Sequence, residues 1–439
     1  MRSLRSFIHS TLRKEEMEAL NLARERLHIP IDEIKNIQEF KVRKLIDYAK
    51  NNSSYYKSVL KNVSYENLND LKKLPFLTKE IIKNEYDGII CKSDFAYLKK
   101  DSTSGSTSQA TYFGTDLRSF NTKRARLDRA NEMNGKYKYL DKILVFWGAE
   151  RDLLNKWDIR KFYNHHIKHA RVISTYHMTK EDINKNLDFI NKWKPCLVVG
   201  YPSALNFMAD FISHNPGILK HFPKGIISAG EMLYETQREN IETQFCSEVF
   251  NRYGSREFTQ IACECSSHSG LHYDAEDLII EVVDDQGNPC PPEVIGHLVI
   301  TDLNNFVFPM IRYQVGDMGS LATYADCACG STLPKLKEIQ GRSFDVIRGI
   351  NGNSVSGSFW TLAFRHKIKG VTRFQVRQKV LDEIEIKIQV GKDFDSQQEN
   401  KIKEIVREKL GEETKVKISM ADQFEYSPTG KFKWVVSNL

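Results

Sequence analysis

The chain has 439 residues, of which 41% are hydrophobic and 28% are charged. This length is sufficient for two or three domains with a buried core, and the composition excludes a disordered or fibrous protein. The 64 Lys and Arg residues exceed the 57 Asp and Glu residues and give a formal charge of +7, which suits an anionic substrate such as a nucleotide and also favours solubility.

The N-terminus shows no targeting pattern. Residues 1–12 lack the apolar core and small-residue cleavage site of a secretory signal, and apolar runs such as residues 143–147 are too short to span a bilayer. We therefore expect a cytoplasmic protein without stable membrane insertion. The basic and apolar residues of the first segment predict a helix that either packs on its own domain or touches a membrane surface. They are Arg2, Leu4, Arg5, Phe7, Ile8, Leu12, Arg13 and Lys14.

The first 90 residues are predicted to be mainly helical. Apolar residues recur three and four positions apart in segments 15–27, 37–51 and 70–83. Thr78 is a suitable N-cap for a helix at the end of the last segment.

A Ser/Thr-rich segment follows at residues 102–108, with Gly105 among its hydroxyl side chains. Hydroxyl and backbone N–H groups in such a segment can cradle an anion, although the same composition is typical of a solvated loop. An Arg-rich helix is expected at residues 120–133 and a buried strand at residues 143–147.

From residue 170 to about residue 260, predicted strands alternate with predicted helices, which indicates a parallel sheet with crossover helices. In such sheets ligands bind at loops beyond the carboxyl ends of the strands. The loops at residues 200–203, 228–231 and 253–257 carry glycine and polar side chains at these places. Strands are expected at residues 170–174, 196–199, 225–228 and 247–251, and helices at residues 182–192, 204–214 and 235–244.

The last part of the chain changes character. Gly, Asn and Pro turns separate strands predicted at residues 278–284, 297–301 and 310–313, a pattern typical of an antiparallel sheet. A small α+β unit follows, with strands at residues 372–379, 383–390 and 415–419 and a helix at residues 397–410. We therefore expect an α/β fold with a large N-terminal domain of mixed sheets and helices, residues 1–344, and a small mobile α+β C-terminal domain, residues 345–439.

Six segments in a fixed order carry a resemblance to a known family. They are residues 102–108, 228–231, 253–257, 311–317, 341–345 and 427–431. In this order they resemble the adenylate-forming superfamily of acyl-CoA synthetases and peptide-synthetase adenylation domains. The phenylacetate-CoA ligase branch is the most similar, and within it the CapK-like proteins associated with capsular polysaccharide synthesis. Branch-level matches occur at residues 200–205, 264–272, 327–330 and 430–432, and the resemblance extends from about residue 40 onward.

The resemblance implies an ATP site. It assigns nucleotide binding to Ser102, Thr103, Ser104, Gly105, Ser106, Thr107, Ala229, Gly230, Glu231, Tyr253, Gly254, Ser255, Asp317, Arg342 and Lys431. The hydroxyls and N–H groups of the Ser/Thr-rich segment are expected to bind the β- and γ-phosphates. Glu257 matches the position that holds magnesium, a hard cation that prefers oxygen ligands.

The other implied roles surround the nucleoside. Tyr253 is expected to stack near the adenine, in a pocket lined by Gly230 and Glu231. Asp317 is expected to accept both ribose hydroxyls, a bidentate role that an ionised carboxylate can fill. The residues expected to be catalytic are Glu257, Arg342, which contacts the ribose or a phosphate, and Lys431, which stabilises charge at the α-phosphate.

Asp345 lies where the family has a hinge between adenylation and acyl transfer, although an ordinary linker aspartate that caps a turn is the alternative. The chain departs from the family at Ser108, Gln109 and Ala110, where the family has glycine, a variable residue that is often lysine, and proline. Without the glycine the loop loses easy access to positive φ, which predicts a stiffer loop and either slower catalysis or an altered phosphate geometry. The retained residues that argue against an inactive protein are Glu257, Asp317, Arg342 and Lys431.

Eight cysteines in a large cytoplasmic chain do not indicate a disulfide framework. Cys265, Cys327 and Cys329 instead suggest a structural zinc site, because two thiolates two residues apart can close on one metal with a distant Cys/His pair. His272 lies in a branch-level match, whereas His268 has the more familiar spacing from Cys265, so either histidine can complete the set. Reduced, buried thiols without a metal are the alternative.

We therefore expect an ATP- and magnesium-dependent, AMP-forming acid ligase. Its acceptor is coenzyme A, or an amine or hydroxyl of a sugar or other metabolite in surface polysaccharide or secondary-metabolite biosynthesis. The acyl pocket is expected at Trp147, Tyr176, Tyr201 and Ser228, which suit an aryl or other medium-sized acid unless the aromatic residues belong to the core. A nucleotide-binding protein without turnover, held together by zinc, is the alternative. Nucleic-acid binding is not expected, since no basic stripe with interleaved aromatic residues accompanies the cysteines; the protein is expected to be a monomer or homodimer.

Overall fold

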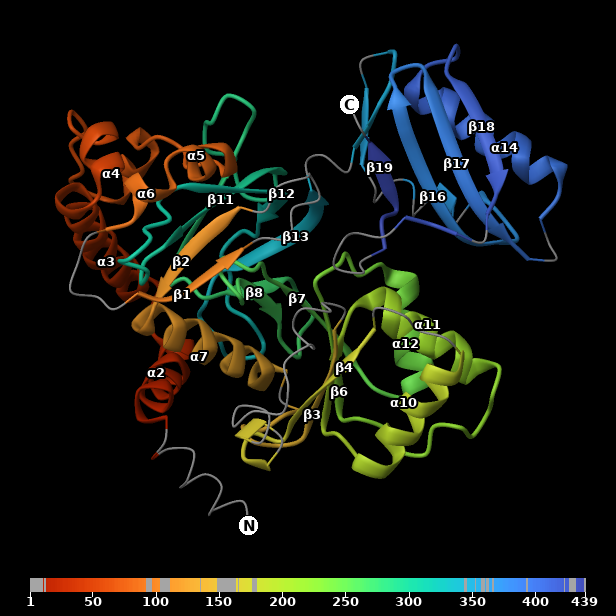
Figure 1. Ribbon diagram of the computed structural model, residues 1–439, viewed down its shortest axis with the longest axis horizontal. Coiled ribbons are helices and arrows are strands. Elements are labelled where there is room, and N and C mark those ends of the chain that lie inside the picture. Colours follow the sequence, from red (N-terminus) through yellow and green to blue (C-terminus); the bar gives the residue numbers. More distant parts are fainter. Residues whose placement is uncertain are drawn as a thin grey trace. The chain divides into compact units, whose positions relative to one another are not determined.

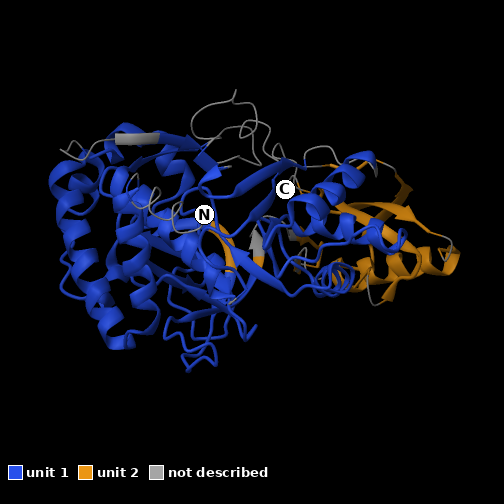
Figure 2. Ribbon diagram, turned by 90° about the horizontal axis from the view of Figure 1, so that it is seen from below, with its two compact units in different colours: residues 1–315, 319–339 blue, residues 316–318, 340–439 orange. Residues whose placement is uncertain are grey.

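The computed structural model divides into two compact units, residues 1–315 with 319–339, and residues 316–318 with 340–439 (Figure 2). Its described residues are 11, 13–91, 97–102, 111–134, 136–147, 163–164, 166–175, 180–342, 346–351, 353–356, 360, 363–364, 367–391, 394–421, 423–425 and 432–437. Among these residues, no helix is long and apolar enough to cross a membrane.

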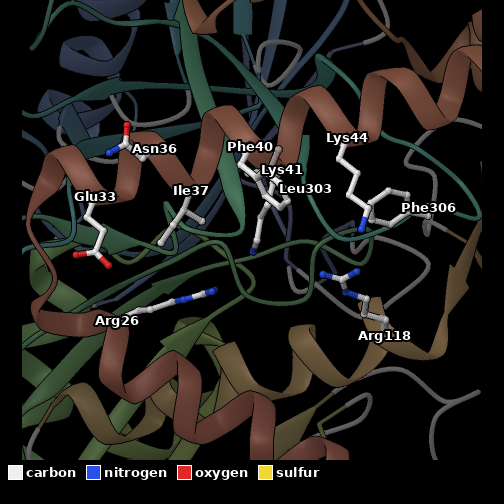
Figure 3. Close-up of a pocket in the computed structure, with 10 residues that line it drawn as sticks. All are labelled: Arg26, Glu33, Asn36, Ile37, Phe40, Lys41, Lys44, Arg118, Leu303 and Phe306. Carbon is white, nitrogen blue, oxygen red and sulfur yellow. The ribbon is translucent and has the colours of Figure 1, made fainter.

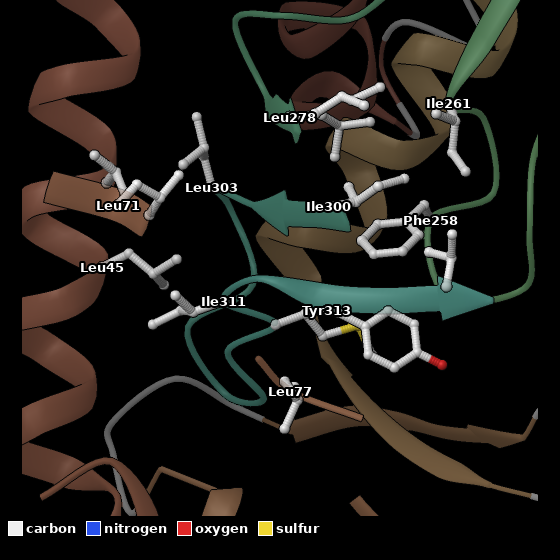
Figure 4. Close-up of a cluster of buried hydrophobic side chains, with 14 of the residues drawn as sticks. Leu45, Leu71, Leu77, Phe258, Ile261, Leu278, Ile300, Leu303, Ile311 and Tyr313 are labelled. Carbon is white, nitrogen blue, oxygen red and sulfur yellow. The ribbon is translucent and has the colours of Figure 1, made fainter. Parts of the chain in front are cut away.

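The first unit begins with helices whose apolar faces cover one end of a large sheet. Helix α3 (Ile31–Asn52) buries Val42, Leu45, Ile46 and Ala49 at a helical spacing. Leu45 belongs to a cluster that also holds Leu71, Leu278 and Ile300 (Figure 4). Thr78 accepts a hydrogen bond from the N–H of Ile81, which confirms the predicted N-cap. The other helices of this region are α2 (Lys14–Glu25), η1 (Arg26–His28), α4 (Ser54–Val59), η2 (Leu68–Lys73), α5 (Lys79–Asn84) and α6 (Tyr86–Ile89).

A hairpin and a long helix connect this region to the sheet. Strands β1 (Tyr97–Ser102) and β2 (Tyr112–Asp116) pair in antiparallel fashion. Helix α7 (Leu117–Met133) follows directly, with Asp116 as its N-cap. It carries the predicted arginines, of which Arg129 is fully buried and forms ion pairs with the carboxylates of Asp274 and Glu276.

The large sheet has eleven strands in the order β10-β11-β12-β13-β9-β8-β7-β6-β5-β3-β4. Strand β3 pairs in parallel with β4 and β5, and β5, β6 and β7 continue the parallel part. This arrangement confirms the predicted parallel sheet. The strands are β3 (Ile143–Trp147), β4 (Ala170–Ser174), β5 (Leu197–Gly200), β6 (Gly225–Ala229), β7 (Val249–Tyr253), β8 (Ala262–Glu264), β9 (Leu271–Tyr273), β10 (Leu278–Val283), β11 (Gly296–Asp302), β12 (Tyr313–Leu321) and β13 (Lys335–Arg342).

The crossover helices α10 (Lys180–Trp193), α11 (Pro202–Ser213) and α12 (Glu235–Phe245) pack beside these parallel strands (Figure 1). Their apolar residues, such as Ile190, Leu205 and Ile241, share one buried cluster with Phe146 and Val198 of the strands. The sheet changes direction at β7, which is parallel to β6 but antiparallel to β8.

The prediction of a strand at residues 310–313 is wrong, because β12 begins only at Tyr313. Arg312 has a φ of 49°, a left-handed conformation that does not fit a strand. Its buried guanidinium donates hydrogen bonds to both oxygens of Glu281 at 3.0 and 2.9 Å and to the carbonyl of Leu74 at 2.6 Å. This residue therefore joins the loop before β12 to the segment after η2.

The second unit contains a four-stranded sheet in the order β18-β17-β16-β19. Alternate residues of β17, Ile384, Ile386 and Ile388, are fully buried, and they share a core with Ile402 and Val406 of α14 (Ser396–Leu410). The strands are β16 (Val371–Val380), β17 (Glu383–Val390), β18 (Lys415–Met420) and β19 (Val435–Ser437), preceded by the small hairpin of β14 (Val346–Arg348) and β15 (Ser354–Ser356).

Candidate active site and candidate metal centre

The carboxyl ends of four parallel strands meet at one edge of the sheet. Phe146 of β3 pairs with Gly200 of β5, Gly200 pairs with Ser228 of β6, and Ser228 pairs with Asn251 of β7. The segments that follow β5, β6 and β7 therefore begin next to one another. This register brings the three glycine-containing loops singled out from the sequence to the place where α/β sheets bind ligands.

Two of the residues expected in the acyl pocket lie against each other at this edge. The rings of Trp147 and Tyr201 stack with their centroids 4.5 Å apart and an interplanar angle of 30°. Gly230 has a φ of 83°, and a Cβ added there would lie 2.8 Å from the Tyr201 ring and 3.3 Å from Trp147. The aromatic pair thus packs directly on the backbone of Gly230, where a side chain would collide with it.

Ser228 and Glu231 lie on either side of this glycine. Ser228 is fully buried, and within the described residues its hydroxyl has no hydrogen-bond partner. Buried hydroxyls normally have a partner, so this one is a candidate contact for a ligand. Oε2 of Glu231 accepts a hydrogen bond of 3.2 Å from the N–H of Ser203, in the first turn of α11. The loop after β6 is therefore held to the loop after β5.

The loop after β7 is a tight turn that carries the expected magnesium ligand. A Cβ at Gly254 would lie 2.2 Å from the carbonyl oxygen of Thr259, so only glycine fits this position. The side chain of Glu257 is 6% exposed, and its Oε1 accepts a hydrogen bond of 2.9 Å from the hydroxyl of Tyr313. No other hydrogen bond to this carboxylate occurs within the described residues. Glu257 thus offers an oriented oxygen donor of the kind that Mg²⁺ prefers.

The same loop contacts the hairpin that carries the hydroxyl-rich segment. Arg256 lies 3.4 Å from the carboxylate of Asp101, at the end of β1 and next to Ser102. The structure therefore brings the loop after β7 to the base of the segment at residues 102–108, although the two are about 150 residues apart in the sequence. Thr103, Ser104, Gly105, Ser106, Thr107 and Ser108 lie outside the described residues.

The remaining expected residues are described only in part. Asp317 lies in β12 directly after Gly316, which has a φ of 87°. Arg342 is the last residue of β13, and nothing is described of its side chain. Tyr176, Asp345 and Lys431 lie outside the described residues. Tyr313 was not singled out from the sequence, although it belongs to the segment at residues 311–317 that carries the resemblance.

The cysteines expected to bind zinc converge in the first unit. One ligand atom each from Cys265, His272, Cys327 and Cys329 lies within 4.8 Å of every other. The sulfur atoms of Cys265 and Cys327 are 3.7 Å apart, close to the separation of about 3.8 Å that two thiolates have on one tetrahedral zinc ion. Nε2 of His272 lies 3.5 Å from the sulfur of Cys329. The donor set therefore fits a closed tetrahedral zinc site.

Hydrogen bonds in this group orient His272 and favour the thiolate of Cys327, whereas burial raises the pKa of Cys329 to about 12. Nδ1 of His272 lies 2.7 Å from the carbonyl oxygen of Leu333, so it donates there and leaves Nε2 for a metal. Burial opposes ionisation of Cys327, yet hydrogen bonds from the backbone of Cys329 and from His272 lower its pKa to about 5. His268 lies outside the group, because Nδ1 of its ring faces Glu264 at 3.2 Å and the ring stacks on Phe250.

The comparisons with known proteins cover most of the chain. Protein CapK of Staphylococcus aureus is 26% identical over 373 residues, which cover 84% of this chain and 81% of CapK. A phenylacetate-coenzyme A ligase of Thermus thermophilus is 24% identical over 388 residues, which cover 83% of each chain. Residues 347–438 match the family model of the CapK C-terminal domain. The chain is a homologue of CapK and of the phenylacetate-coenzyme A ligases.

A solved structure of 2-hydroxyisobutyryl-CoA ligase in the postadenylation state has the same fold. It is 17% identical, has a TM-score of 0.73, and the alignment covers 94% of this chain and 92% of that one. The relatives confirm the predicted family and the predicted α/β fold, and they agree with the predicted class of enzyme, an AMP-forming acid ligase.

Proposed function

We propose that this CapK homologue is an ATP- and magnesium-dependent ligase that converts a carboxylic acid to an acyl-adenylate and transfers the acyl group to an acceptor. The observation that carries the proposal is the buried carboxylate of Glu257, oriented by Tyr313 in the loop that contacts the hairpin of the hydroxyl-rich segment. A single oriented oxygen donor beside a phosphate-binding loop is what the positioning of a triphosphate requires.

The proposed reaction has two steps. One oxygen of the acid attacks the α-phosphorus of ATP, the bond to the bridging oxygen breaks, and pyrophosphate leaves with the bonding electrons. The acceptor then attacks the carbonyl carbon, loses its proton and displaces AMP. Bound magnesium would neutralise part of the triphosphate charge in the first step.

The protein groups have separate roles in this proposal. Thr103, Ser104, Ser106 and Thr107 hold the phosphates, and Glu257 holds the metal. The ribose is bound by Asp317, and the adenine lies beside Tyr253, in a pocket lined by Ala229, Gly230 and Glu231. Arg342 contacts the ribose or a phosphate, and Lys431 stabilises charge that develops at the α-phosphate. Asp345 is the proposed hinge for the second step.

The proposed acid is of medium size and carries an aryl or similar group. The stacked rings of Trp147 and Tyr201 offer an apolar surface beside the unpartnered hydroxyl of Ser228. The phenylacetate-coenzyme A ligase relatives support coenzyme A as the acceptor. The second proposed acceptor class, an amine or hydroxyl of a sugar or other metabolite in surface polysaccharide or secondary-metabolite biosynthesis, rests on the resemblance to the CapK-like proteins described from the sequence.

Acid-dependent exchange of labelled pyrophosphate into ATP, measured across a panel of aryl and aliphatic acids, tests the first step. We expect exchange with a subset of acids, loss of exchange in Lys431→Ala with ATP binding retained, and a changed acid preference in Tyr201→Ala. ATP binding without exchange for any acid would instead support the nucleotide-binding protein without turnover. Coenzyme A and amine acceptors, added separately to the adenylate, distinguish the two acceptor classes by the mass of the product.

We also propose that Cys265, His272, Cys327 and Cys329 hold a structural zinc ion. The four donors come from the β8–β9 segment and from the loop between β12 and β13, so the metal would join these two segments. Such a site has no open position for a substrate, which favours a structural role over a catalytic one.

A further inference from the structure

A cavity of about 400 Å³ lies in the first unit, among residues that the site above does not use (Figure 3). One wall is a single face of α3, on which Glu33, Ile37, Phe40, Lys41 and Lys44 recur at a helical spacing. The opposite wall comes from η1, from the first turn of α7 and from the loop between β11 and β12. We call this space the α3 cavity; these walls contribute Arg26, Arg118, Leu303 and Phe306.

The charged lining of the α3 cavity is mostly positive. In Figure 3 the charged ends of Arg26, Lys41, Lys44 and Arg118 point into the same space. Glu33 is the acidic residue of the lining. A second carboxylate, that of Asp277, lies 2.6 Å from Lys41 and 4.0 Å from Arg26. Arg26 and Lys41 therefore have a carboxylate partner in Asp277.

Two of these cations have no carboxylate to balance them. The ammonium of Lys44 lies 5.9 Å from the centroid of the Phe306 ring, and the guanidinium of Arg118 lies 5.7 Å from the same centroid. Neither side chain forms an ion pair within the described residues. Two like charges beside one ring repel each other, and an anion bound between them would attract both.

Apolar side chains are exposed beside these charges. Phe40 is 69% exposed although it lies on the same face of α3 as Ile37 and Lys44. A neighbouring cavity of about 610 Å³ shares Arg26, Lys41 and Arg118 with the α3 cavity. This second cavity is lined by Leu22 and Leu117, each 45% exposed. Three of the large apolar residues exposed on the described part of the chain thus border these two adjoining cavities.

We propose that the α3 cavity binds a soluble phosphate monoester that carries an apolar or aromatic group. A phosphate monoester has a charge of about −1.5 to −2 at pH 7, which Lys44 and Arg118 can balance because neither forms an ion pair within the described residues. The planar guanidinium of Arg118 suits two phosphate oxygens, and Lys44 supplies a point charge from the other side of the cavity. The exposed ring of Phe40 gives the apolar group a surface on which to pack. A flat bilayer cannot enter a hollow of this kind, which favours a soluble ligand over a lipid surface.

Titration of the full-length chain with 1-naphthyl phosphate, followed by its fluorescence, tests this site. We expect saturable binding that weakens about tenfold in Lys44→Ala and in Arg118→Ala, since each variant removes one charge-assisted contact. Phe40→Ala should weaken binding of 1-naphthyl phosphate while leaving the weaker binding of inorganic phosphate unchanged. 1-Naphthol, which lacks the phosphate, should bind much more weakly than 1-naphthyl phosphate.

The control variant is Lys35→Ala. Lys35 lies on the same helix, is 60% exposed and pairs with Asp32, but does not line the cavity. Lys44, Arg118 and Phe40 are exposed, so their variants should keep the thermal midpoint and the pyrophosphate exchange of the parent chain.

Three outcomes would overturn the proposal. The first is equal affinity for 1-naphthyl phosphate in the parent, Lys44→Ala and Arg118→Ala, because the probe would then bind elsewhere. The second is the absence of any binding of the probe. The third is sedimentation with phosphatidic acid vesicles that depends on Lys44 and Arg118 while the soluble probe does not bind, which would assign the cavity to a lipid surface.

Discussion

Replacing Gly230 by alanine should damage both the stability of the first unit and the binding of the acid. The φ of 83° at Gly230 costs an L-residue about 1–2 kcal/mol. In addition, the new Cβ would lie 2.8 Å from the ring of Tyr201, which is 2% exposed and already stacked on Trp147. Forcing such a buried ring aside typically costs about 1–3 kcal/mol. The expected total loss is therefore about 2–5 kcal/mol.

Gly217 offers a matched control for this substitution. Its φ of 82° is nearly the same, but no heavy atom lies within 4 Å of an added Cβ. Gly217→Ala should therefore lose only the backbone contribution, about 1–2 kcal/mol. The difference between the two variants isolates the contact with the aromatic pair.

Urea unfolding followed by tryptophan fluorescence measures the loss of stability, and pyrophosphate exchange measures the KM for the acid. We expect Gly230→Ala to be less stable than Gly217→Ala by about 1–3 kcal/mol and to be the one variant of the two with a raised KM. Equal loss of stability in both variants, with an unchanged KM for the acid, would refute the conclusion that the rings of Trp147 and Tyr201 pack against this turn.

Three further predictions concern other parts of the first unit. Tyr313→Phe removes the hydrogen bond to Glu257, which should cost about 1.5 kcal/mol and raise the KM for magnesium ATP roughly tenfold. An unchanged KM would show that Tyr313 does not orient the metal ligand. Mass spectrometry of the purified metal should find one zinc per chain in the parent and in Cys246→Ser, an exposed cysteine outside the group, but not in Cys327→Ser. Removal of zinc by a chelator should lower the thermal midpoint, because structural zinc contributes on the order of 10 kcal/mol in small zinc domains. If Cys327→Ser contained as much zinc as the parent chain, zinc binding at this group would be excluded. Burial alone would raise the pKa of Asp277, but Lys41 and Arg126 lower it below its ordinary value. The unfolded chain therefore binds more protons in acid, so stability should fall as the pH drops below about 5, and less steeply in Asp277→Asn when urea unfolding is repeated at each pH.

The sequence predicts the strand ends better than it predicts the contacts between distant segments. Alternating strands and helices identify a parallel sheet, and the common edge of its strands follows from that topology, as the positions of Trp147, Tyr201 and Gly230 show. The hydrogen bond from Tyr313 to Glu257 joins residues 56 positions apart, and no local pattern marks it. The left-handed backbone of Arg312 likewise accompanies hydrogen bonds to the distant Glu281, against a local apolar pattern that favours a strand.

The histidine that completes the proposed zinc site is also not predictable from the local sequence. Local spacing favours His268, whereas the register of the sheet decides for His272. Because Cys263 of β8 pairs with His272 of β9, the histidine is carried back beside Cys265 by the hairpin. The α3 cavity has no sequence signal of its own, because its charges come from η1 and α3 and from α7, which lies far along the chain from the other two.

The reversal of strand direction at β7 determines how the turn that carries Glu257 is attached to the sheet. Strands β5 and β6 are followed by the crossover helices α11 and α12 before the next strand begins, whereas β7 returns through residues 254–261 into its neighbour β8. The return needs no helix, and Gly254 lets the chain approach itself closely, because a Cβ there would meet the carbonyl of Thr259. The turn that carries Glu257 is thus attached to the sheet at both ends, so an insertion between Gly254 and Thr259 would shift the proposed magnesium ligand.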